Sequence, residues 1–166
     1  MWIGNFSEER GFGLKDIFIE NLPLILTIIG IIAAILPSGV GSTRGATMIG
    51  KAAAALISEQ PEKFGQSLVL QMMSASQGLY GFIVGFLIFI NMGDSIAISL
   101  AIRNLGAGLL MGVTGYLTAI QQSITATAGI QILAKKPEHS TKGVLYSAMI
   151  ETYAIFAFVI SVLIVL

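Results

Sequence analysis

The chain has 166 residues, of which 55% are hydrophobic and only 11% are charged. A soluble domain usually carries about 25% charged residues, so this composition favours a membrane protein. The formal net charge at pH 7 is zero, which gives no reason to expect a nucleic-acid partner, and the lack of cysteine excludes disulfides and thiolate metal sites.

Residues 1–20 form an N-terminal extension in which acidic residues come before basic ones. That order is wrong for the positively charged start of a cleaved signal peptide, so we expect the segment to be retained. It either lies on the membrane as a short interfacial helix, with Trp2, Phe6 and Phe12 at the lipid boundary, or has no fixed structure.

Four long segments then follow with almost no charged residues, namely 21–43, 64–93, 104–134 and 143–166. About 20 apolar residues span the hydrocarbon core of a bilayer, so we predict an all-α membrane protein with four transmembrane helices. The single charged residue in these segments is Glu151, in the last one. The second and third segments are longer than a bilayer requires, so their helices should tilt or project into water.

The distribution of lysine and arginine predicts the orientation of these helices. Five lysines lie in or beside the connections of the first helix to the second and of the third to the fourth, against three basic residues on the opposite side. Because positive residues favour the cytoplasm, we expect a protein of the cell membrane with the loops near 61 and 137 in the cytoplasm and both termini outside. The lysines are Lys51, Lys63, Lys135, Lys136 and Lys142, and the opposite set is Arg10, Lys15 and Arg103.

Two stretches of the chain resemble each other at an offset of 76 residues, AAAALISEQPEK (52–63) and AGIQILAKKPEH (128–139). Each contains a Pro-Glu pair, which we expect at the bend of a helical hairpin. We therefore predict two tandem hairpins, 21–93 and 94–166, that arose by duplication. The offset aligns Glu151 with Ala75, so only the second hairpin carries an ionisable group in its last helix.

A charge at the centre of a bilayer costs about 2.5–3.5 kcal/mol, so Glu151 must be neutralised by a proton, a cation or a basic side chain. Arg44 is the only basic residue that we expect near its depth. In an antiparallel helix pair, residues equally far from the turn lie at one depth. By this rule, Gln122 and Gln77 should lie at the level of Glu151.

One face of the second helix carries polar groups at positions i, i+3, i+4 and i+7, near this predicted level. With Gln122 and Thr152, these groups offer several neutral oxygens beside the Glu151 carboxylate, and such a set suits a hard monovalent cation. Two alternatives stay open: Glu151 as a protonated packing residue, and the glutamines as hydrogen bonds between helices. The four residues of this face are Met73, through its backbone carbonyl, Ser76, Gln77 and Tyr80.

Glycine is concentrated in the first and third helices, whereas the second and fourth are bulky. Small residues let helix backbones approach closely. We therefore expect the first and third helices to form a tight inner wall, and the second and fourth an outer wall facing lipid, in a ring of copies. The glycines are Gly39, Gly41, Gly45, Gly50, Gly106, Gly108, Gly112 and Gly115.

From about residue 35 to its end, the chain resembles the proteolipids that form the rotor ring of V-type ATPases, the K or c subunits. The resemblance is greatest to the duplicated, four-helix form in bacterial sodium-translocating V-type ATPases. It is carried by GKAAAALISEQPEKFGQSLVLQ, QGLYGFIVGFLIFIN, AGIQILAKKPEHSTKG and ETYAIFAFVIS.

The resemblance implies a set of ion ligands. Glu151 would bind the transported ion together with Gln122 and three groups of the second helix: Gln77, Ser76 and the Met73 carbonyl. Tyr80 would donate a hydrogen bond to the carboxylate. The chain departs from the family pattern where the family has threonine, at Ser76, and where it has Pro-Gly, at Ser74 and Ala75.

The resemblance also implies a rotary mechanism and its partners. Identical subunits would form the ring, a stator subunit would displace Na⁺ from Glu151 with an arginine, and a central stalk would sit on the cytoplasmic lysine loops. Membrane lipids would surround the ring. A separate head would hydrolyse ATP, because the chain has no GxxxxGK[ST] motif. No organic cofactor is expected. The alternatives are a proton-carrying ring, a four-helix drug exporter that uses protons, and a structural pore protein.

Overall fold

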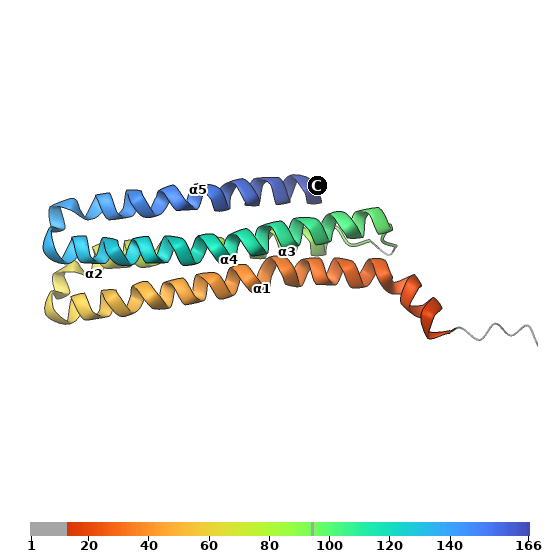
Figure 1. The fold of residues 1–166 in the computed structure, drawn as a ribbon, viewed down its shortest axis with the longest axis horizontal. Helices are drawn as coiled ribbons and strands as arrows, with labels where there is room; N and C mark the ends of the chain where they lie inside the picture. Colours follow the sequence, from red (N-terminus) through yellow and green to blue (C-terminus); the bar gives the residue numbers. More distant parts are fainter. Residues whose placement is uncertain (1–12, 94) are drawn as a thin grey trace, which may run out of the picture.

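The computed structural model describes residues 13–93 and 95–166, so the expectation for Trp2, Phe6 and Phe12 falls outside the described residues. Within those ranges, four helical spans are long and apolar enough to cross a membrane, and no strand occurs. The prediction of an all-α fold with four membrane-spanning helices is therefore confirmed. Figure 1 shows the spans lying lengthwise beside one another.

Three of the four spans are single long helices. They are α1 (Leu14–Glu59), α4 (Ile98–Lys135) and α5 (Ser140–Val165). The beginning of α1 and the end of α5 lie at the same end of the bundle (Figure 1).

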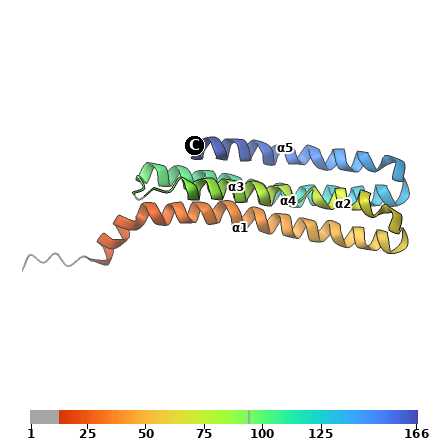
Figure 2. The same ribbon diagram turned by 180° about the vertical axis from the view of Figure 1, so that it is seen from behind.

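The second span is divided into two helices, α2 (Phe64–Met72) and α3 (Ser76–Ile90). Figure 2 shows α2 and α3 following one another along the same span. Short 3-10 turns at Pro61–Lys63 and Pro137–His139 join α1 to α2 and α4 to α5. The two Pro-Glu pairs of the sequence thus lie in the two bends, at the end of the bundle opposite the start of α1 (Figure 1).

Helix α1 is much longer than the uncharged segment 21–43 from which it was predicted. It continues past Arg44 and contains Pro23 and Pro37. Proline has no N–H, so Pro37 leaves the carbonyl of Ala33 without its usual helical donor. Such breaks are tolerated in membrane helices when neighbouring groups surround the freed backbone.

Helices α1 and α4 approach each other closely through glycine, as the sequence predicts for the first and third helices. A Cβ atom on Gly112 would lie 1.7 Å from the carbonyl oxygen of Ala33, and one on Gly108 would lie 2.0 Å from that of Gly30. No other residue fits at these two positions. Gly39 and Gly106 take no part in this contact, since nothing lies within 4 Å of the place where their Cβ atoms would lie.

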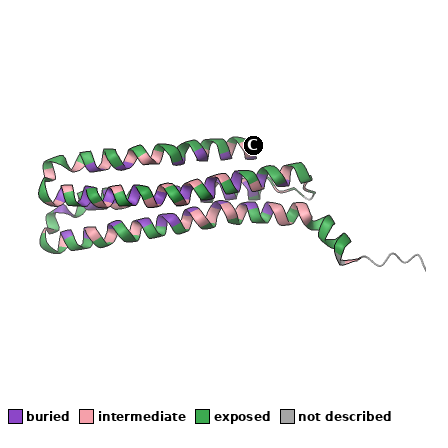
Figure 3. Ribbon diagram, in the orientation of Figure 1, coloured by how far each residue is buried: buried purple, intermediate pink, exposed green. Residues whose placement is uncertain are grey.

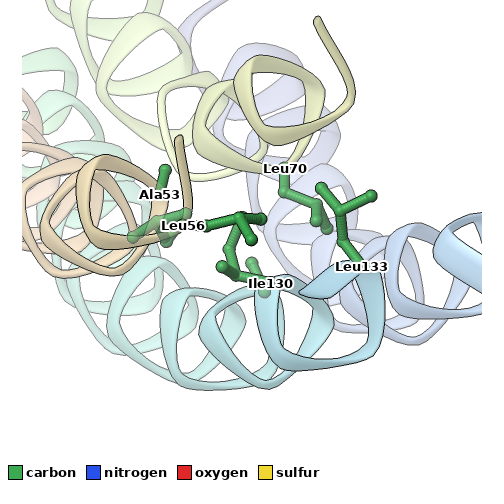
Figure 4. Close-up of a cluster of buried hydrophobic side chains, with 7 residues drawn as sticks. Ala53, Leu56, Leu70, Ile130 and Leu133 are labelled. Atoms are coloured by element: carbon green, nitrogen blue, oxygen red, sulfur yellow. The ribbon is translucent and has the colours of Figure 1, made fainter. Parts of the chain in front are cut away.

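Two apolar clusters form the core, and polar side chains are buried between them. The first joins α1, α2 and α4 near the turns (Figure 4). The second joins α1, α3, α4 and α5. The outer faces of the spans are exposed (Figure 3) and carry many large apolar residues, as surfaces in contact with lipid or other subunits do. The first cluster contains Ile49, Ala53, Leu56, Leu70, Ala126, Ile130 and Leu133, and the second contains Ala34, Val84, Ile88, Ala107, Met111 and Val165.

Lys63 is buried at the first turn. Its Nζ donates a hydrogen bond to the carbonyl oxygen of Ala134, 3.1 Å away, near the end of α4. The carbonyls of the last helical turn have no partner within their own helix. Lys63 therefore caps α4 and links the turn of one hairpin to the adjacent hairpin.

Candidate functional site

Glu151 lies on α5, half-buried, and accepts hydrogen bonds from two other helices. The hydroxyl of Tyr80 on α3 donates to Oε1 at 2.9 Å. The amide Nε2 of Gln122 on α4 donates to Oε2 at 3.3 Å. Both carboxylate oxygens are thus oriented by neutral donors.

Gln122 and Gln77 continue this network into the core. Both side chains are fully buried, and Nε2 of Gln77 donates to Oε1 of Gln122. The three residues placed at one depth by counting from the turns are therefore joined in one chain of hydrogen bonds. The amide oxygen Oε1 of Gln77 is buried and has no hydrogen-bond partner among the described residues. An acceptor left in this way is normally satisfied by a donor, a water or a cation.

The break between α2 and α3 places two further oxygens beside Gln77 in the sequence. The Ser76 hydroxyl, half-buried, donates to the carbonyl oxygen of Met73 at 3.3 Å. No backbone N–H within the described ranges donates to that carbonyl. Its dipole is therefore available to a further partner, which a carbonyl inside a continuous helix is not.

Thr152 is not brought into this network. Its hydroxyl is exposed and donates to the carbonyl oxygen of Met149 on its own helix, at 2.7 Å. Adjacent residues of a helix point about 100° apart, so Thr152 leaves the face that Glu151 occupies.

Arg44 does not neutralise Glu151 either. Its Nη1 donates to the hydroxyl of Tyr116 at 2.9 Å, on the exposed surface of α1 and α4. Across the described part of the chain, the one close contact between a potentially basic and an acidic side chain is that of His139 with Glu138, 4.0 Å apart, in the second turn. Glu151 therefore has no basic partner there, and a proton or a cation is left to cancel its charge.

The donor set fits a monovalent cation. It consists of the Glu151 carboxylate, the unpartnered oxygen of Gln77, the Ser76 hydroxyl and the freed carbonyl of Met73. Alkali cations prefer such hard oxygen donors, and one carboxylate gives the site a single negative charge. The described residues contain no group of three or more His, Cys, Asp or Glu that would suit a transition metal.

Two serines at this level were not predicted. The hydroxyl of Ser147 donates to the backbone carbonyl of Gln122 at 3.3 Å. Ser147 precedes Glu151 by four residues and so shares its helix face, which is a signal that the sequence does contain. Ser42 on α1 accepts a hydrogen bond from the N–H of Gly78 at 2.8 Å, and no spacing within one helix indicates that contact.

Comparison with known proteins gives a consistent set of relatives. The family of ATP synthase C subunits matches the chain twice, at residues 29–88 and 105–164, and these segments start 76 residues apart. The V-type sodium ATPase subunit K of Enterococcus hirae is 51% identical over 147 residues, covering 89% of this chain and 94% of the relative. The A-type ATP synthase subunit K of Methanocaldococcus jannaschii is 36% identical, covering 85% of this chain and 62% of the relative. The 16 kDa proteolipid of the human V-type proton ATPase is 25% identical, covering 82% and 88%.

Proposed function

The chain belongs to the family of ATP synthase C subunits, and from this premise we propose that it is a rotor-ring subunit of a V-type ATPase that carries Na⁺ at Glu151. It is a non-catalytic subunit, and ATP is hydrolysed on other chains of the complex. One observation carries the choice of ion: the buried oxygen of Gln77 has no partner, directly beside the Gln122 and Glu151 hydrogen bonds.

The proposed site uses each side chain in a distinct way. Glu151 supplies the charge that holds Na⁺, and Tyr80 fixes one carboxylate oxygen by donating to it. Gln77, Ser76 and the Met73 carbonyl supply neutral oxygens that replace water around the ion. Gln122 donates to the second carboxylate oxygen, so an ion that binds this oxygen displaces the amide N–H.

Charge cancellation explains how a carboxylate is carried through lipid. An ionised Glu151 is costly in hydrocarbon, whereas the Na⁺ carboxylate pair is neutral as a whole. An arginine of a stator subunit would compete with Na⁺ for the carboxylate and release the ion as each site passes. The two turns would face the cytoplasm and contact a central stalk, and both termini would face outside.

A proton-carrying ring is the second candidate. Both oxygens of Glu151 are already hydrogen-bonded to Tyr80 and Gln122, so the carboxyl group is held in place without any cation. The human relative that is 25% identical is named as part of a proton ATPase. Membership of the family of ATP synthase C subunits argues against the drug-exporter alternative.

Carbodiimide labelling of Glu151 in the purified ring tests the proposal, because carbodiimides attack the protonated carboxyl group. We would measure the labelled mass between about pH 6 and 8, with Na⁺ or with the same concentration of choline, and use Glu151→Gln as the unlabelled control. Protection by millimolar or lower Na⁺, but not by choline, is the expected result. Labelling that follows pH and ignores Na⁺ would instead establish the proton ring.

A further inference from the structure

The second span is broken where the chain has neither proline nor glycine. Residues 73–75 form the turns between α2 and α3. The N–H of Met73 donates to the carbonyl of Leu70 at 3.4 Å and that of Ala75 to Met72 at 3.0 Å, each three residues back instead of four. Besides proline and pairs of small residues, a side chain that enters the backbone ladder can break a helix in this way.

Ser42 of α1 enters the ladder at this break. Its hydroxyl accepts the N–H of Gly78 at 2.8 Å, and in a continuous helix this N–H would donate to the carbonyl of Ser74. Ser42 is buried, and the missing side chain of Gly78 leaves room for its approach, since a Cβ there would lie 3.1 Å from the Ser42 hydroxyl oxygen. The hydroxyl thus substitutes for a backbone carbonyl and leaves the ladder open.

The open ladder frees the backbone oxygens nearest the site. Within residues 13–93 and 95–166, no backbone N–H donates to the carbonyl of Met73 or of Ser74. The Met73 carbonyl accepts only the Ser76 hydroxyl, at 3.3 Å. A helix that closed over residues 73–75 would pair the Met73 carbonyl with the N–H of Gln77 and withdraw it from an ion.

We propose that Ser42 is a positioning residue for ion binding: it holds the N–H of Gly78 away from the Ser74 carbonyl. This contact prevents the helix from closing over residues 73–75 and so keeps the Met73 carbonyl free for Na⁺. This inference rests on the proposed function of Glu151. The pattern of the rotor proteolipids that the chain resembles has Pro-Gly at positions 74 and 75. Here Ser74 and Ala75 occupy those positions, and the break depends on a hydroxyl from the neighbouring helix.

The direct test compares Ser42→Ala with Ser38→Ala. Ser38 lies one turn earlier on α1 and is buried like Ser42, but its hydroxyl donates to Ala34 of its own helix at 2.6 Å. Removing a group that orients a metal ligand weakens metal binding about 10- to 100-fold. We expect Ser42→Ala to raise the Na⁺ concentration that half-protects Glu151 from carbodiimide about tenfold or more, and Ser38→Ala to change it less than about threefold. Equal effects of the two variants would overturn the proposal.

A rescue experiment guards against a general loss of stability. In a chain that carries Ser74→Pro and Ala75→Gly, the break is imposed by the backbone itself. Ser42→Ala should then change Na⁺ protection by less than about threefold, because the Pro-Gly pair already keeps the helix open without the Ser42 hydroxyl. The proposal is supported if Ser42→Ala impairs assembly or Na⁺ protection in the unmodified chain but not in the chain that carries Ser74→Pro and Ala75→Gly. An equal defect in both chains contradicts it.

Hydrogen exchange separates failure of this inference from failure of the sodium assignment. In Ser42→Ala the helix can close over residues 73–75, and the N–H of Gln77 then gains the Met73 carbonyl as an acceptor. Peptides covering residues 73–80 should therefore exchange about tenfold more slowly than in Ser38→Ala, without Na⁺. If the unmodified ring shows no Na⁺ protection, the sodium assignment fails and exchange alone decides the role of Ser42. Unchanged or faster exchange in Ser42→Ala would then overturn it.

Discussion

Glu151 is held by neutral side chains of two neighbouring helices, not by a basic residue. Tyr80 and Gln122 each donate to one of its carboxylate oxygens. These hydrogen bonds orient the carboxylate but leave its net charge in place. The residue is therefore prepared to bind a cation and still needs one, or a proton, before it faces lipid.

The contribution of Tyr80 can be isolated with Tyr80→Phe. The ring of Tyr80 stacks on Phe158, with centroids 5.0 Å apart, and phenylalanine keeps that contact while removing the hydroxyl. A hydrogen bond to a charged group contributes about 1.5–3 kcal/mol. Without this bond, one carboxylate oxygen is no longer held in place for Na⁺, so half-protection of Glu151 from carbodiimide should need at least about tenfold more Na⁺.

The matched control is Tyr153→Phe. Tyr153 lies on α5 two residues after Glu151, is 65% exposed, and also contacts a phenylalanine, Phe156. This variant should bind Na⁺ as the unmodified chain does. If both tyrosine variants behave alike, the Tyr80 hydroxyl does not support the carboxylate.

At the scale of helices, the contact of α1 with α4 depends on two glycines that meet carbonyl oxygens. A methyl group at Gly112 would lie 1.7 Å from the Ala33 carbonyl oxygen, which belongs to the backbone and cannot rotate away. We predict that Gly112→Ala forces the two helices apart and lowers the free energy of unfolding by about 1–3 kcal/mol or more. Denaturation of the purified chain in detergent, followed by circular dichroism, measures this change.

Gly65→Ala provides the comparison. Gly65 lies in α2 with nothing within 4 Å of its Cβ position, and alanine is a better helix former by about 1 kcal/mol at most. This variant should be as stable as the unmodified chain or slightly more stable. A Gly112→Ala chain of equal stability would show that the α1 and α4 contact tolerates a wider separation.

Helices and turns could largely be predicted from the sequence, because uncharged segments and Pro-Glu pairs are local signals. Counting from the turns also agrees with the hydrogen bonds that join Gln77, Gln122 and Glu151, although their role as ion ligands stays a prediction. The break at residues 73–75 could not be predicted, since the segment contains neither proline nor glycine. Its cause lies in Ser42, which is 36 residues before Gly78 in the chain and next to it in space.

For the whole molecule, the two halves related by the sequence repeat lie next to each other, so that residues of α1 pack near their equivalents in α4. Helices α1 and α4 run side by side in the same direction, with Gly30 against Asn104 and Gly45 against Ser123. These pairs differ by 74 and 78 residues, close to the offset of 76 that relates the two halves. If the displacement that relates α1 to α4 is applied once more, α1 of a second copy lies against the free face of α4.

The free face of α4 has room for a neighbouring α1. The offset of 76 makes Gly106 the equivalent of Gly30, and Gly106 is exposed with open space at its Cβ position. Within the chain, Gly108 packs on Gly30, and the equivalent of Gly108 in α1 is Ile32, which is 52% exposed. In a ring, Gly106 of one copy should therefore lie against Ile32 of the next.

Disulfide cross-linking tests this arrangement directly, because the chain has no cysteine of its own. A chain carrying both Gly106→Cys and Ile32→Cys should form a ladder of covalent oligomers when the membranes are oxidised, since each copy links to two neighbours. The control pairs Ile32→Cys with Met149→Cys, an exposed position on α5, and should stay monomeric. A ladder in both chains would indicate random collision, and monomers in both would rule out a ring built by repeating the contact of α1 with α4.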